Sequence, residues 1–227
     1  MGSSVAIGID IGQRQDPTAL CVAERADDHF VVRHLERLEL GTPYPAVAQR
    51  IAHVYAGVLE RVAADIFEAR AREVGSFADE RSFAELERQA RERVWILVDA
   101  TGVGTPVIDL LRESGGLQAA RITGVFLTAG ERCALRPHDT EGRVGKAYLV
   151  SRLQALIQSR RIALPRTAEA RALADELLNY EIRVDEQTAL LQAGAFKTGT
   201  HDDLATALGL ACLLDTTTYR CGSLQYA

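Results

Sequence analysis

Four aspartates stand at the ends of predicted strands and helices, where carboxylates can gather and bind metal ions. Asp10 and Asp99 each close an apolar run, and Asp202 and Asp203 open the last helical stretch. Gathered carboxylates repel one another, and their pKa values rise unless a positive charge lies between them. Mg²⁺ and Mn²⁺ prefer oxygen ligands, and two such ions roughly 3.5–4 Å apart can promote hydrolysis of a phosphodiester. The residue types therefore indicate a site for two Mg²⁺ or Mn²⁺ ions.

Each aspartate also has a simpler structural explanation. An Asp at the end of a strand commonly forms a turn or caps the next helix, and an acidic pair at a helix start complements the helix dipole. The joint spacing favours the metal site. If the strands that end at Asp10 and Asp99 are neighbours in one sheet, and the last helix packs across it, all four carboxyl groups meet at one end of the sheet.

The elements that must position these residues alternate between strands and helices. Three apolar runs joined by tight turns predict an antiparallel three-strand meander, and a long amphipathic helix follows it. The sequence thus predicts an α/β fold in which a mixed sheet is flanked by helices. The expected strands are at 5–12, 18–24, 30–35, 94–99, 122–127 and 162–165, the helices at 45–72, 82–93, 104–111, 144–157, 168–179 and 201–214, with a polar loop at 128–142 and a hairpin near 190–191.

Length and composition are those of an ordinary globular protein. With 227 residues, 47% of them hydrophobic and 25% charged, the chain fits a single domain, 1–227, with a charged, solvent-facing helical insertion around 73–93. It lacks an apolar run of roughly 18 residues, so we expect no membrane partner. Its four cysteines are scattered without a Cys-x-x-Cys pair, which argues against a zinc site or a disulfide framework and favours a reducing cytoplasm.

The net charge of −5 disfavours a nucleic-acid partner, but the charges are segregated. Nine Arg or Lys residues lie between positions 132 and 171, against three acidic residues. Such a basic stretch can contact phosphates on one face of the molecule. A solvated, charged helix explains it equally well, so charge alone does not decide the partner.

Three motifs resemble the nuclease domain of phage large terminases, the subunits of DNA-packaging motors. The segment 8–12, Gly-Ile-Asp-Ile-Gly, followed by Asp-Pro-Thr-Ala at 16–19, resembles the first motif of that family. Val-Asp-Ala-Thr-Gly-Val-Gly at 98–104 is similar to the second, and His-Asp-Asp-Leu-Ala-Thr-Ala-Leu at 201–208 to the third. The lysine-bearing helix and strand at 145–165 match as well. Only the charged insertion has no counterpart.

This resemblance implies a ribonuclease-H-like sheet and two-metal endonucleolytic cleavage of double-stranded DNA during genome packaging. It makes Asp10, Asp99 and at least one of Asp202 and Asp203 catalytic metal ligands. Counted around the last predicted helix, Asp203 lies on the flank of the apolar residues that follow it. This helical phase favours Asp203 as the direct ligand. Asp202 would then assist the metal or the water.

The resemblance also indicates residues that contact DNA phosphates. Lys146 and Lys197 are the only lysines of the chain, and both flank the predicted site. Arg143 belongs to the basic stretch, and His201 precedes the acidic pair. For each of these residues, a chance position on the surface is the alternative explanation.

The chain lacks the Gly-x-x-x-x-Gly-Lys-Ser/Thr loop of a nucleotide-binding motor. We therefore expect it to be the C-terminal half of a motor subunit. Its partners would be double-stranded DNA, an ATPase domain, a small terminase subunit and a portal, in the cytoplasm of the host cell. Two alternatives stay open: a nuclease resembling Holliday-junction resolvases, and a non-catalytic module that docks on DNA or on the portal.

Overall fold

An eight-stranded mixed sheet forms the centre of the computed structural model, which describes residues 3–12, 16–74, 80–102, 104–136, 139–179, 181–184, 191–194 and 202–213. The strand order is β6-β7-β5-β4-β1-β2-β3-β8. The strands are β1 (Ser4–Asp10), β2 (Ala19–Ala26), β3 (His29–Arg37), β4 (Val94–Asp99), β5 (Ile122–Thr128), β6 (Cys133–Ala134), β7 (Glu141–Gly145) and β8 (Ile162–Ala163).

The pairing of β1 places the first two aspartates side by side. β1, β2 and β3 form the predicted antiparallel meander. On its other side β1 pairs in parallel with β4, and Ile9 lies opposite Val98. Asp10 and Asp99 each follow one of these two residues, so both aspartates close neighbouring parallel strands at the same end of the sheet.

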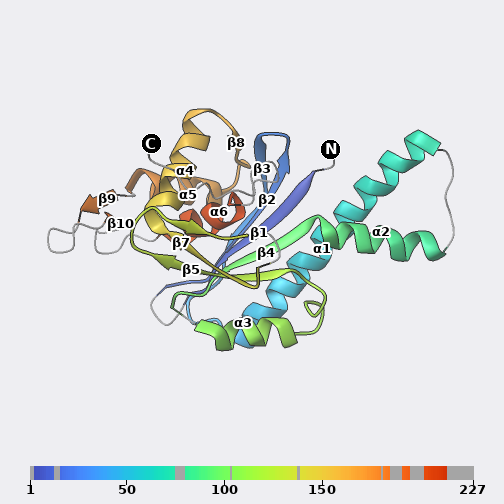
Figure 1. The fold of residues 1–227 in the computed structure, drawn as a ribbon, viewed down its shortest axis with the longest axis horizontal. Helices are drawn as coiled ribbons and strands as arrows, with labels where there is room; N and C mark the ends of the chain where they lie inside the picture. Colours follow the sequence, from blue (N-terminus) through green and yellow to red (C-terminus); the bar gives the residue numbers. More distant parts are fainter. Residues whose placement is uncertain are drawn as a thin grey trace.

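Helices cover both faces of the sheet (Figure 1). One hydrophobic core lies between the sheet and α1–α3, and a second lies between the sheet and α4–α6. A separate two-stranded hairpin, predicted from the sequence, lies beside the main sheet. The elements are α1 (Tyr44–Val74), α2 (Glu80–Glu92), α3 (Gly104–Glu113), α4 (Lys146–Gln158), α5 (Ala168–Asn179), α6 (Asp203–Ala211), β9 (Glu181–Val184) and β10 (Leu191–Gly194).

Strand alternation turns the aspartates toward α6. Ile7 and Ile9 belong to the core beneath α1, whereas Ala6 belongs to the core beneath α6. Side chains alternate along a strand, so Asp10 shares the face of Ala6. Likewise, Leu97 packs in the α6 core, which places Asp99 on that same face.

Gly8 lets α6 approach the sheet closely. A Cβ atom at Gly8 would collide with the carbonyl oxygen of Ala207 and lie 2.5 Å from the nitrogen of Ala211. All nine residues of α6 are buried. The glycine of the first motif therefore serves packing, since it allows the helix that carries the third motif to rest directly on β1.

The predicted polar loop at 128–142 is wrong in part, because it contains β6 and the start of β7. β7 pairs in parallel with β5, yet only one of its five residues is a large apolar side chain. Glycines take the buried positions instead: a Cβ at Gly145 would collide with the carbonyl oxygen of Gly130, and one at Gly142 with Leu135. Hydrophobic periodicity gives no signal for such a strand.

The distal part of α1 and α2 form a hairpin that projects from the sheet (Figure 1). The sequence predicted a solvent-facing insertion here, but Leu86 and Ala90 of α2 are buried in the core beneath α1. α2 is therefore amphipathic and docked, with only one face exposed. That residues 1–227 form a single domain stays a prediction. Among the described helices, none is long and apolar enough to cross a bilayer.

Candidate active site

A pocket of about 840 Å³ lies where β1 and β4 end and α6 begins. Three of the four predicted aspartates line it: Asp10, Asp99 and Asp202, each half-buried. The sheet places the first two and the start of α6 places the third. The full lining is Asp10, Ile11, Gly12, Asp16, Gly41, Thr42, Pro43, Tyr44, Asp99, Thr101, Gly102, Lys146 and Asp202.

Asp10 lies at the electrostatic centre of this pocket. Burial raises its pKa well above the usual value, and the neighbouring carboxylates of Asp99, Asp203 and Asp202 raise it further. Lys146 acts in the opposite direction. Because like charges act mainly over short distances, the other three predicted aspartates are acidic neighbours of Asp10, and Lys146 opposes their effect.

Asp99 is oriented by the turn that follows its strand. The backbone N–H of Thr101 donates to Asp99 Oδ1 at 2.8 Å. The hydroxyl oxygen of Thr101 accepts from the N–H of Leu127 at 2.7 Å, which ties the turn to β5. Burial raises the pKa of Asp99, and the hydrogen bonds to Thr101 oppose that rise. Thr101 thus holds one carboxylate oxygen of Asp99.

The two aspartates of the third motif have different surroundings. Asp202 is the N-cap residue of α6, its side chain makes no capping hydrogen bond, and it lines the pocket. Asp203 is only 3% exposed, and its Oδ2 lies 3.3 Å from Nε of Arg37. The geometry thus favours Asp202 as the group that faces the pocket, opposite to the preference from helical phase. With φ −130° and ψ 13°, Asp202 is not helical, so helical phase does not describe its direction.

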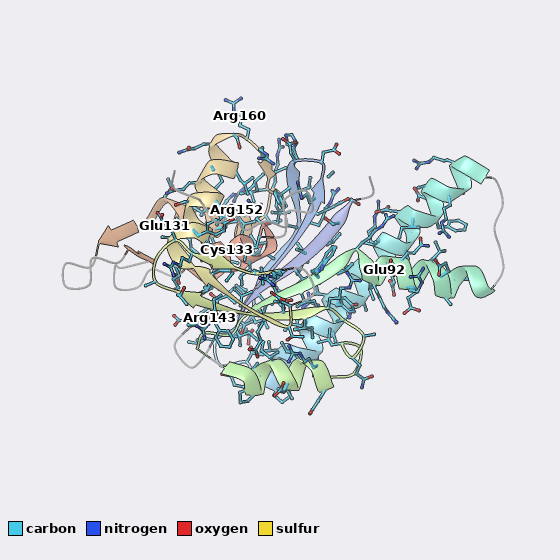
Figure 2. All side chains as sticks on the ribbon, viewed as in Figure 1. Glu92, Glu131, Cys133, Arg143, Arg152 and Arg160 are labelled. Carbon is cyan, nitrogen blue, oxygen red and sulfur yellow. The ribbon has the colours of Figure 1, made fainter. Side chains whose placement is uncertain are left out.

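Of the predicted cationic residues, one lines the pocket. Lys146 begins α4 directly after β7 and lowers the pKa values of both Asp10 and Asp99, against the stronger effect of burial. Arg143 lies exposed on β7, outside the pocket lining (Figure 2). Lys197 and His201 lie outside the described residues.

Sequence reasoning missed one rim of the pocket. Asp16, which begins the Asp-Pro-Thr-Ala part of the first motif, lines it, and so does the segment 41–44 that leads into α1. The Gly-Thr-Pro-Tyr order of that segment is typical of a turn before a helix. The segment follows β3, and β3 runs in the same direction as β1 because β2 pairs antiparallel with both. It therefore begins at the end of the sheet where Asp10 lies.

Two more charged residues, Arg37 and Glu176, lie behind the pocket and were also missed. Glu176 of α5 is 7% exposed and pairs with Arg37 at the end of β3. One oxygen of Glu176 accepts the N–H of Ala205 at 2.9 Å. Burial raises the pKa of Glu176 to about 7, despite the opposing effects of the Ala205 N–H and of Arg37.

The donor chemistry of the pocket fits Mg²⁺ or Mn²⁺. Within the described ranges, no three carboxylate, imidazole or thiol groups are arranged to hold one ion together. Mg²⁺ does not require such a cage, because one or two carboxylates usually hold it while water and substrate phosphates complete its shell. The raised pKa of Asp10, caused by burial and by three like charges, marks a place where a cation is favourable.

Comparisons with known proteins agree with this architecture. A family model described as the terminase RNaseH-like domain matches residues 7–214. A comparison with curated protein sequences gave no match. Among solved structures, the large terminase nuclease of the thermophilic phage G20c is 20% identical, with a TM-score of 0.54 over 92% of this chain and 81% of that one.

Two further solved structures are similar. The large terminase nuclease domain of Thermus phage P74-26 is 18% identical, with a TM-score of 0.52 over 92% of this chain and 78% of that one. The manganese-soaked terminase nuclease domain of human cytomegalovirus is 12% identical, with a TM-score of 0.50 over 92% and 82%. Together these likenesses confirm the predicted ribonuclease-H-like fold class.

Proposed function

Because this chain belongs to the terminase RNaseH-like domain family, we propose that it is a divalent-metal-dependent endonuclease that cuts double-stranded DNA during viral genome packaging. One observation carries the proposal: Asp10, Asp99 and Asp202 line a single pocket together with Lys146. Carboxylates gathered without enough countercharge destabilise a fold unless they bind something positive.

In this proposal Asp10, Asp99 and Asp202 hold Mg²⁺ or Mn²⁺, two ions in the complete site. When bound, the ions would supply activation of water and stabilisation of the leaving oxygen. Asp203 acts from behind, through its charge and its pairing with Arg37.

The side chain of Lys146 lines the same pocket. Lys146 can bind a DNA phosphate beside the aspartates and partly offsets their negative charge. The resemblance extends this phosphate-contacting role to Arg143, Lys197 and His201. Contacts of this kind predict binding that weakens with salt and does not depend on sequence.

The partners are proposed on the basis of the family. Besides double-stranded DNA, they are an ATPase domain, a small terminase subunit and a portal, and the place of action is the cytoplasm of the infected cell. An endonuclease tethered to a motor needs little DNA affinity of its own, because tethering raises the local concentration of its substrate. This agrees with the net charge of −5.

The test compares Asp10→Asn with a matched control, Asp109→Asn, which changes an exposed aspartate of α3 that pairs with Arg112. Supercoiled plasmid, linear duplex and a four-way junction are incubated with each protein in Mn²⁺, Mg²⁺ or EDTA. We expect the wild type and the control to cut duplex DNA only with metal. We expect Asp10→Asn to be at least about a thousandfold slower.

Each other outcome has a definite meaning. Cleavage by both the wild type and Asp10→Asn would indicate a contaminating nuclease. A strong preference for the four-way junction would instead support the resolvase-like alternative. Failure of the wild type to cut any substrate, together with DNA binding, would support a docking module.

A further inference from the structure

The start of α6 is capped from outside the helix. Helix starts leave backbone N–H groups without intrahelical partners, and an Asp at the N-cap usually accepts one of them. Asp202 does not do so. Instead, Glu176 Oε2 accepts the N–H of Ala205, the third residue of α6, at 2.9 Å. A residue of α5 therefore fills the position that the Asp202 carboxylate would normally occupy.

The capping glutamate is itself fixed in place. Its other oxygen pairs with Nη2 of Arg37, and Nε of Arg37 lies 3.3 Å from Asp203 Oδ2. The Glu176 side chain is 7% exposed and that of Arg37 is 28% exposed. β3, α5 and α6 are thus joined behind the pocket by groups that are largely shielded from water.

The opposite end of α6 is capped in the same manner. Nε of Arg152 on α4 donates to the carbonyl oxygen of Cys212, the C-cap residue, at 2.9 Å. Figure 2 shows Arg152 beside α6. An anion at the start and a cation at the end both complement the helix dipole. Neighbouring helices therefore supply a cap at each end of α6.

We propose that Glu176 is a positioning residue that caps α6 in place of Asp202 and thereby leaves the Asp202 carboxylate turned into the pocket. This role rests on the proposed metal-dependent nuclease function, because Glu176 leaves the Asp202 carboxylate available to bind the cation. Arg37 holds Glu176 in the required position. The two adjacent aspartates of the third motif then differ in role: Asp203 anchors the helix and Asp202 faces the ligand.

Loss of Glu176 would have a specific consequence. The Ala205 N–H would become an unsatisfied buried donor, which is costly. Asp202 is the nearest natural replacement, because an N-cap carboxylate reaches the N–H of the second or third helical residue. Its carboxylate would then leave the pocket, so the helix start would stay protected while the metal site would lose a ligand.

The experiment uses Glu176→Ala, Glu176→Gln and the double variant Glu176→Ala with Asp202→Ala. Asp175→Ala changes the exposed neighbour on α5 and serves as the control. Calorimetric titration with Mn²⁺ should show affinity reduced about tenfold to a hundredfold in Glu176→Ala. Binding in Glu176→Gln should lie between that of the wild type and that of Glu176→Ala, because its amide oxygen can still accept the Ala205 N–H while its NH2 group cannot accept from Arg37. With duplex DNA, kcat should fall while KM changes little.

Amide hydrogen exchange at Ala205, measured in the metal-free protein, distinguishes a positioning role of Glu176 from a merely structural one. Glu176→Ala should keep the protection of this amide, because Asp202 takes over the cap, whereas the double variant should lose it. Loss of protection in Glu176→Ala equal to that in the double variant would overturn the proposal, and so would unchanged Mn²⁺ affinity in Glu176→Ala. If the wild type neither binds Mn²⁺ nor cuts DNA, the proposed function fails, and the exchange pattern still decides which residue caps α6.

Discussion

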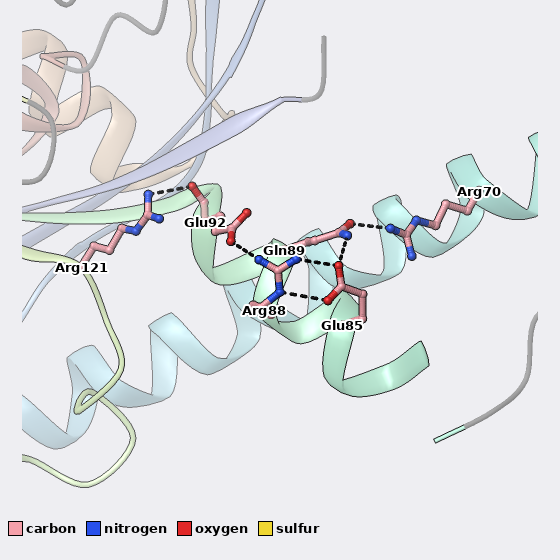
Figure 3. Close-up of polar contacts among 6 residues, drawn as sticks. All are labelled: Arg70, Glu85, Arg88, Gln89, Glu92 and Arg121. Carbon is pink, nitrogen blue, oxygen red and sulfur yellow. Dashed lines mark hydrogen bonds and ion pairs between the residues drawn. The ribbon is translucent and has the colours of Figure 1, made fainter. Parts of the chain in front are cut away.

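The aspartate pocket and the projecting α1–α2 hairpin are both rich in charge, but they arrange it in opposite ways. In the hairpin, exposed charges pair with residues of opposite sign in the same helix: Arg88 pairs with Glu85 and with Glu92 (Figure 3). Hydrogen bonds from Arg88 and then Gln89 lower the pKa of Glu85 to about 2. In the pocket, burial and like charges raise the pKa of Asp10.

The difference shows where the molecule has uncompensated charge. The hairpin neutralises itself with exposed ion pairs, which add little to stability in water but keep the outer face of α2 soluble. Among the lining residues that the structure describes, Lys146 is the one cation beside the pocket's carboxylates. This arrangement costs stability in the isolated protein, and such a cost is typical of sites shaped for a ligand.

The largest expected effect compares Gly8 of β1, on which α6 rests, with Gly57 in the middle of α1. Gly8→Ala would place a Cβ against the backbone of α6 at Ala207 and Ala211, so we expect it to lower the free energy of unfolding by about 3 kcal/mol or more. Gly57 of α1 has open space around its Cα, so Gly57→Ala should raise that free energy by about 1 kcal/mol. Urea denaturation of both variants measures the contrast.

Opposite signs at the two glycines would show that α6 rests on β1 as closely as described. A Gly8→Ala variant as stable as the wild type would contradict the direct packing, and with it the placement of Asp202 beside Asp10. Loss of stability in Gly57→Ala would instead contradict the open surroundings of that glycine on α1.

The second expected effect concerns the cost of charge in the pocket without metal. The pKa of Asp10 is raised in the folded protein, so folding favours its protonated form. Its contribution to the free energy of unfolding is therefore fully present below the unfolded-state pKa and is lost as pH rises through the folded-state pKa. Asn at this position keeps the shape without the charge. In EDTA at pH 8, Asp10→Asn should therefore be more stable than the wild type, by on the order of 1 kcal/mol.

This gain should shrink at pH 5, where the wild-type carboxyl group holds more protons. Adding Mn²⁺ at pH 8 should stabilise the wild type and leave Asp10→Asn nearly unchanged. Denaturation curves at both pH values, with and without Mn²⁺, provide the measurement. If the variant proves less stable than the wild type in EDTA at pH 8, the pocket does not hold uncompensated charge.

The sequence predicted those parts of the fold and of the pocket that depend on local patterns. β1, β4 and α6 have continuous apolar runs, so their ends and the aspartates at those ends could be located. The antiparallel meander followed from tight turns, and the family followed from three motifs. The metal-binding and DNA-binding roles of the individual residues stay predictions.

What the sequence could not predict depends on contacts between distant elements. β7 is built on close backbone approach at Gly142 and Gly145, which leaves no hydrophobic periodicity. Glu176 lies in an ordinary amphipathic helix, and only the fold brings it to Ala205. Asp202 precedes the first helical residue and lines the pocket, a placement that helical phase cannot describe, and which of the two aspartates binds the metal stays a prediction.

The smallest expected effect lies in the hairpin. Arg88 is exposed and pairs with Glu85 at 2.7 Å within its own helix, where solvent and salt screen the interaction. Arg88→Ala should therefore change the thermal midpoint by less than about 2 °C, and the small difference should vanish in 1 M NaCl. DNA cleavage should remain at the wild-type level, since Arg88 lies on α2 and does not line the pocket. A cleavage defect in Arg88→Ala, with unchanged folding, would mean that the hairpin's charges also act on a substrate and that the two regions are not separate in function.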